Sequence, residues 1–98
     1  MMGYKIIRFE STPNPNAIKC ILDAPISDRP KSFLNAAAAD DDPLGSPFFE
    51  LPGIRNILVN DNWISVNKLD ETPWSTLKPA LRRVVRDLPA PREGSSDG

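Results

Sequence analysis

Residues 54–68 read IRNILVNDNWISVNK, and this stretch predicts the fold. Ile57 and Val59 alternate with Leu58 before the segment 60–62 (NDN), and Ile64 and Val66 alternate with more polar residues after it. Such alternation is typical of strands that present one apolar face. Asn and Asp tolerate the left-handed backbone conformations of tight turns. We therefore predict a hairpin of strands 54–59 and 63–68, with its more apolar face covered by helices.

A second hairpin is predicted nearer the N-terminus. Residues 4–9 (YKIIRF) and 17–22 (AIKCIL) are apolar-rich runs of strand length, and the turn-forming segment Glu10 to Asn16 separates them.

Two helices are predicted to cover the sheet. The first is short, with Ser46 as its N-cap, Pro47 as its first residue and an end at 52–53. The second starts with Thr72 and Pro73 and ends before Pro89 and Pro91. Its apolar stripe, at helical spacing, is Trp74, Leu77, Leu81, Val84, Val85 and Leu88.

The predicted fold class is therefore α+β, with two β-hairpins forming a largely antiparallel sheet and helices on one face, in the order ββαββα. The connection 24–43 shows no strand period, so we expect a mobile segment, in which the alanines could add a turn of helix. One domain is expected over residues 1–88, and the tail 89–98 is expected to be disordered because it has almost nothing apolar to bury.

Composition excludes several functions. The 98 residues include no histidine and a single cysteine, so the usual base of nucleophilic catalysis is absent and we predict no enzyme activity. Twelve basic and 13 acidic residues leave a net charge of −1, which disfavours nucleic acid and anionic membranes as partners. No apolar run spans a bilayer. The N-terminus resembles neither a secretory signal nor a transit peptide, so a cytoplasmic location is expected.

Residues 12–19 read TPNPNAIK, which resembles the signature of the N-terminal domain of Nfu/NifU-type iron–sulfur cluster scaffold proteins. Ser46 and Pro47, the segment LPGIRNILVNDNWISVNK at 51–68, and then Trp74, Leu77, Lys78 and Pro79 resemble later parts of that domain in the same order. The resemblance covers most of residues 4–86. It implies an α+β fold and a role in iron–sulfur cluster assembly. Scaffolds of this family also have a domain whose Cys-x-x-Cys pair holds the cluster, and no residue here corresponds to that pair.

The candidate protein-binding residues are the proline–asparagine loop (Thr12, Pro13, Asn14, Pro15 and Asn16) and Trp63. Two prolines fix φ and two asparagines bond nearby backbone, so the loop should be stiff and lose little entropy on docking. Its alternative interpretation is a rigid hairpin connection. Trp63 should lie on the sheet face away from the helices, as a partner anchor or in cross-strand packing.

No metal site or cofactor is predicted for this chain alone. Iron–sulfur clusters need several thiolates, so Cys20 is interpreted as a buried small hydrophobe, and any cluster would be held through a partner. The consecutive Asp40, Asp41 and Asp42 lack calcium-loop spacing. Lys78, Arg82 and Arg86, with Arg83 beside them, form a basic line interpreted as a solvated helix face.

The predicted function is a non-catalytic accessory domain in iron–sulfur cluster assembly that docks on scaffold, carrier or recipient proteins. The alternatives are a structural interaction or dimerisation module without a cluster role, and a protein that binds iron directly through carboxylates. The sequence leaves the oligomeric state open.

Overall fold

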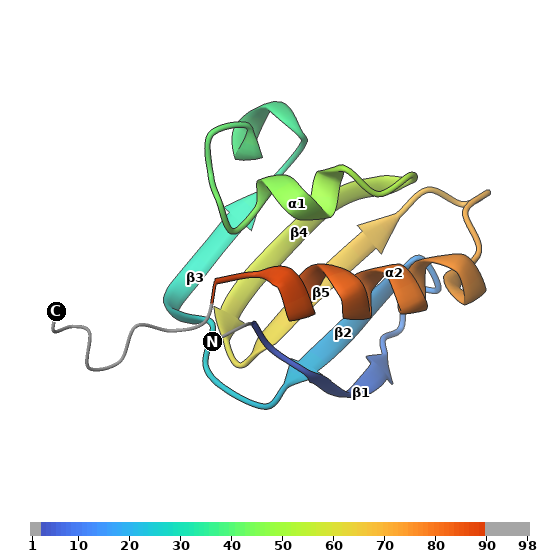
Figure 1. Ribbon diagram of the computed structural model, residues 1–98. Helices are drawn as coiled ribbons and strands as arrows, with labels where there is room; N and C mark the ends of the chain where they lie inside the picture. Colours follow the sequence, from blue (N-terminus) through green and yellow to red (C-terminus); the bar gives the residue numbers. More distant parts are fainter. Residues whose placement is uncertain (1–2, 90–98) are drawn as a thin grey trace, which may run out of the picture.

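The structure is a computed structural model that describes residues 3–89 (Figure 1). Its strands are β1 (Ile6–Ser11), β2 (Ala17–Leu22), β3 (Ser27–Phe33), β4 (Ile54–Asp61) and β5 (Trp63–Lys68). Its helices are the 3-10 turn η1 (Ala37–Ala39), α1 (Ser46–Phe49) and α2 (Trp74–Asp87). No helix within the described range is long and apolar enough to cross a membrane. Apart from Pro89, the predicted tail 89–98 lies outside the described residues.

The five strands form one sheet in the order β1-β2-β5-β4-β3, and all neighbours are antiparallel. The two predicted hairpins are β1–β2 and β4–β5, and they join through the pairing of β2 with β5. α1 and α2 lie on the same face of the sheet, as Figure 1 shows. The predicted α+β class with helices on one face is confirmed.

The decisive hairpin forms, with a turn one residue shorter than the predicted segment 60–62. Asn60 pairs with Trp63, so Asp61 and Asn62 make the turn, and Asp61 adopts a φ of +50°. Aspartate is one of the few residues besides glycine that adopt this left-handed conformation at low cost. The hairpin register places the alternate residues Ile57, Val59, Ile64 and Val66 together on the helix side, where each is at most 1% exposed.

The core lies between this sheet face and the helices. α2 contributes most of the helical side: Leu77, Leu81, Val85 and Leu88 are buried as the predicted stripe requires, together with Ala80. Trp74 and Val84 pack against the core and are half-buried. α1 contributes Phe48. A helix of 14 residues thus continues through Pro79, although proline removes one of its backbone hydrogen bonds.

The expectation that segment 24–43 contains no strand is wrong. Residues 27–33 (SDRPKSF) form β3, which pairs with β4 at the sheet edge and buries only Phe33. An edge strand needs hydrogen bonds on one side only, so it tolerates Pro30 and a largely polar sequence. The alanines do form a turn of helix, as η1.

Several predicted boundaries also shift, and β1 and β4 each run two residues further than predicted, to Ser11 and Asp61. β1 begins two residues later than predicted, because Tyr4 instead lies against α2 and donates its backbone N–H to the Val85 carbonyl. The N-cap residues are Gly45 and Pro73 rather than Ser46 and Thr72, and neither helix has a side-chain cap hydrogen bond. Packing of the apolar residues, rather than capping, therefore sets where these helices start.

Candidate protein-interaction site

The proline–asparagine loop connects β1 to β2 and is held by its own side chains. The Thr12 hydroxyl lies 2.9 Å from the Asn14 carbonyl oxygen and 3.0 Å from the Ala17 carbonyl oxygen, and it accepts the Asn14 backbone N–H. The Asn14 side-chain oxygen accepts the Asn16 N–H at 2.9 Å. The Asn14 side chain therefore closes the turn, which is the local bonding that asparagine favours.

The loop is also tied to the segment that leads from β5 into α2. The Trp74 indole N–H donates to the Pro15 carbonyl at 3.0 Å, and the Lys68 backbone N–H donates to the Asn16 carbonyl at 2.9 Å. The Asn16 side-chain NH₂ donates to a carboxylate oxygen of Asp70. These bonds join residues more than 50 positions apart in the sequence, so the loop is a fixed part of the tertiary structure.

Lys68 is the buried charge of this corner, with 6% of its surface exposed. Its ammonium donates to the Asn16 side-chain oxygen at 3.0 Å and to the Leu69 carbonyl at 3.2 Å, and lies 5.3 Å from the centre of the Trp74 ring. A buried ammonium requires such partners. The sequence interpretation did not include Lys68, although its alternation with Ile64 and Val66 places it on the helix side of β5.

Trp63 lies at the opposite end of β5, on the face that no described helix covers. It pairs with Ile21 and Asn60, is half-buried, and has the Lys19 ammonium 4.4 Å from its ring centre. The predicted facing of Trp63 is confirmed, and Leu58 lies half-buried on the same face. Five residues of strand, about 17 Å, separate Trp63 from Lys68, so the structure does not bring it together with the loop.

Cys20 lies in the core, 1% exposed and opposite Phe9 and Ile64 in the sheet. Burial raises the pKa of its thiol to about 12, despite the lowering effect of the nearby Arg82 and Lys78 charges. The thiol is therefore protonated at neutral pH, in the form that neither binds metals nor reacts readily. The predicted burial is confirmed.

The aspartates at 40–42 do not act together. Asp42 accepts the backbone N–H groups of Leu44 and Gly45, at 2.7 Å and 3.1 Å, and lies 3.4 Å from the Lys31 ammonium. Burial alone would raise the pKa of Asp42, but these bonds and the lysine charge lower it. Asp42 thus holds the turn before α1. Within residues 3–89, no three Cys, Asp or Glu side chains gather as a metal site would require.

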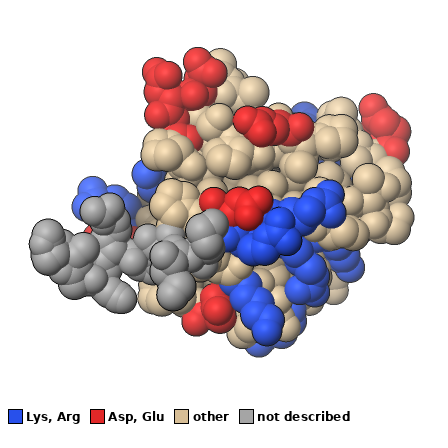
Figure 2. All heavy atoms as spheres, in the orientation of Figure 1, with Lys and Arg blue, Asp and Glu red and all other residues tan. Residues whose placement is uncertain are grey.

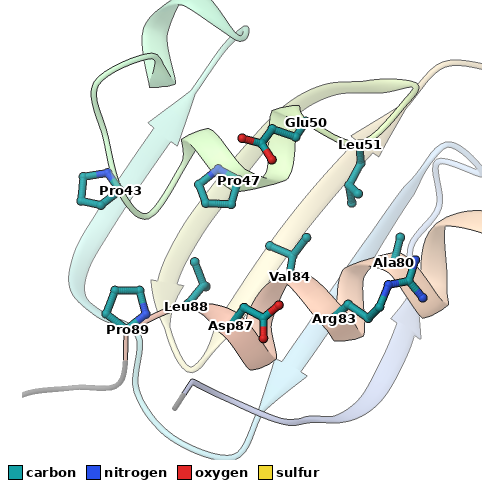
Figure 3. Close-up of a pocket in the computed structure, with 10 residues that line it drawn as sticks. All are labelled: Pro43, Pro47, Glu50, Leu51, Ala80, Arg83, Val84, Asp87, Leu88 and Pro89. Carbon is teal, nitrogen blue, oxygen red and sulfur yellow. The ribbon is translucent and has the colours of Figure 1, made fainter. Parts of the chain in front are cut away.

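A hollow of about 500 Å³ lies between α1 and the second half of α2 (Figure 3). Leu51 points into it from the segment after α1, Val84 points into it from α2, and Leu88 points into it from the C-cap position of α2. Glu50, Arg83 and Asp87 also line it. The apolar stripe of α2 and the predicted ends of the helices do not reveal this hollow in the sequence, because its shape depends on how α1 and α2 pack relative to each other.

The sheet, its two covering helices and the tied loop define an α+β domain in which no helix among residues 3–89 covers the second sheet face. Residues 7–90 match the family described as Scaffold protein Nfu/NifU N terminal, so the chain belongs to this family. The resemblance found in the sequence is confirmed.

Relatives and solved structures agree with this assignment. The human NFU1 iron-sulfur cluster scaffold homolog, mitochondrial, is 33% identical over 87% of this chain, and the Arabidopsis thaliana NifU-like protein 5, mitochondrial, is 29% identical over 84%. This chain spans only about a third of either relative, 34% and 30% respectively. The crystal structure of protein SAV1430 from Staphylococcus aureus superimposes with a TM-score of 0.66 at 23% identity, covering 82% of this chain and 96% of that one, which shows a shared fold.

Proposed function

We propose that this domain is a non-catalytic docking module in iron–sulfur cluster assembly. It binds scaffold, carrier or recipient proteins, and the cluster is held by the partner. Membership of the Nfu/NifU N-terminal family supports the cluster context. The observation that carries the docking role is the rigid proline–asparagine loop, whose backbone is fixed before any partner arrives.

The loop offers a preformed contact surface. Pro13, Asn14 and Pro15 are exposed, while Thr12 and Asn16 are half-buried and bonded within the corner. A partner would meet the two proline rings and the outer side of Asn14. Because the backbone is already ordered, docking there costs little conformational entropy. Asn16 serves this surface by positioning it.

Trp63 supplies a second contact on the open sheet face. An aromatic ring beside Ile21 and Leu58 gives a partner a flat apolar area with a polar surround, the usual setting of an interface anchor. Ile21 is only 8% exposed and adds little accessible surface. Of these three residues, Trp63 and Leu58 therefore provide most of the apolar surface that a partner could contact.

The test is co-elution of the full chain with a separately purified Cys-x-x-Cys domain of an Nfu-type scaffold, reconstituted anaerobically with iron and sulfide. We expect one complex in size-exclusion chromatography, with the visible absorbance of the cluster entering only with the partner. Trp63→Lys should weaken co-elution. Leu34→Lys is the matched control, because Leu34 is an exposed apolar residue, 71% accessible, in the connection after β3.

Two results would overturn the proposal. Colour in the isolated chain after reconstitution would show that it holds the cluster itself. Separate elution of the two proteins, together with the same result for recipient proteins of the assembly pathway, would remove the docking role. Both relatives described above are named as mitochondrial proteins, and the cytoplasmic location of this chain stays a prediction.

A further inference from the structure

Basic side chains gather where residues 4–6 lie beside α2, and Figure 2 shows a group of Lys and Arg side chains on this side of the molecule. We call this surface the basic face, and its members are Lys5, Lys78, Arg82, Arg83 and Arg86. From the sequence alone, the α2 residues among them are expected to form a solvated helix face. The structure adds Lys5 from the other end of the chain, together with a shaped surface between them.

Arg82 is held in place. Its guanidinium donates to the Ile6 carbonyl at 3.0 Å and lies 4.9 Å from the centre of the Phe9 ring, where the Lys78 ammonium also lies at 5.2 Å. The hydrogen bond and the cation–π contact restrict Arg82, and a cation–π contact restricts Lys78, so both charges are positioned before any ligand binds. Among the acceptors of residues 3–89, Arg82 donates to one, the Ile6 carbonyl, through one nitrogen, which leaves its other nitrogens for a ligand.

A hollow of about 360 Å³ runs along these charges. Tyr4 and Ile6, both buried, form its inner wall, and Lys5, Arg82, Arg83 and Arg86 surround it. Among residues 3–89, Arg86 is the one member of the basic face with a carboxylate within ion-pair distance, that of Asp87, and both side chains are more than 60% exposed. One further carboxylate lies at this end of the face, that of Asp23, which accepts the Lys5 backbone N–H at 3.0 Å. Five cations against these two carboxylates leave a local excess of positive charge in a chain whose net charge is −1.

We propose that the basic face binds an Asp- and Glu-rich segment of a protein partner. Charge complementarity selects such a segment, and guanidinium groups pair with carboxylates through two parallel hydrogen bonds. Nucleic acid fits less well, because the rings at this surface, Tyr4 and Phe9, are buried or covered by cations and offer no base-stacking platform. This surface is separate from the loop and from Trp63, so the inference goes beyond the proposed function.

The experiment uses the full chain and a fluorescein-labelled peptide of alternating Glu and Ala. Fluorescence anisotropy measures its binding across a salt series, and backbone NMR shifts locate it. We expect saturable binding that weakens with salt and shifts concentrated in 4–8 and 78–86. Lys5→Glu with Arg83→Glu should weaken binding at least about fivefold, since each exposed ion pair contributes modestly. Neither side chain makes a hydrogen bond in the described structure, so the variant should fold.

Arg29→Glu with Arg55→Glu is the matched control. It makes the same change in net charge at exposed positions on β3 and β4, far from β1 in the sheet order. Binding kept by this control and lost by the first variant supports the proposal. Equal losses, no binding of the peptide, or shifts elsewhere on the domain would overturn it. Tighter binding of a single-stranded oligothymidylate at the same residues would also overturn it, as evidence of a nucleic-acid surface.

Discussion

At the Lys68 end of β5, the polar side chains that meet the loop are bonded within the domain: the Lys68 ammonium, both ends of the Asn16 amide and the Trp74 indole all have partners. At the Trp63 end, the aromatic ring lies on an uncovered sheet face and contacts one lysine, Lys19. At the Lys68 end, the polar side chains hold the loop backbone in one conformation. At the Trp63 end, part of the side-chain surface is accessible to a partner. The two proposed contacts should therefore respond differently to substitution, through stability at one end and through binding at the other.

The largest effect is expected from Lys68→Ala. It removes a buried stem and leaves the Asn16 side-chain oxygen and the Leu69 carbonyl without their donor, so the free energy of unfolding should fall by about 2–3 kcal/mol. Urea denaturation followed by circular dichroism measures this. Lys68→Met keeps the stem and separates the loss of packing from the loss of the ammonium. A Lys68→Ala protein as stable as the unchanged chain would contradict the buried role of this lysine.

A smaller effect is expected from Trp74→Phe, which keeps an aromatic ring but removes the N–H that bonds Pro15. The expected loss of stability is about 1 kcal/mol, the usual net value of one hydrogen bond. Hydrogen exchange should quicken at the backbone N–H groups of Asn16 and Ala17, because the loop loses its tie to α2. Trp63→Phe is the control at the other end of β5. Equal exchange rates in both variants would show that the indole bond does not restrain the loop.

The contrast between the two ends also explains what the sequence could predict. Strands β4 and β5, and α2, follow from local periodicity, because each buries one face and its residue pattern repeats accordingly. The facing of Trp63 follows from the same alternation. β3 could not be predicted in this way. It is an exposed edge strand that contains Pro30 and buries one residue, so its sequence has no apolar period.

The corner around Lys68 could be predicted only in part. The stiffness of the proline–asparagine loop follows from its own residues. Its bonds to Lys68 and Trp74 connect positions 52 and 59 residues apart, and no local pattern specifies such partners. The basic face could also be predicted only in part. Lys5 lies beside α2 in space but far from it in the sequence, and no local pattern predicts that contact.

The smallest effect is expected from Lys19→Gln, which tests how open the Trp63 end is. An exposed cation–π contact contributes about 0.5 kcal/mol, so stability should change by no more than that. In a Trp74→Phe background Trp63 is the single tryptophan, since the chain has two, and its fluorescence reports on this ring alone. Removing the ammonium that lies over the ring should increase quenching by acrylamide, while Lys5→Gln, which contacts neither tryptophan, should leave quenching unchanged. Equal quenching with and without Lys19 would contradict the shielding of the half-buried Trp63 ring by this ammonium.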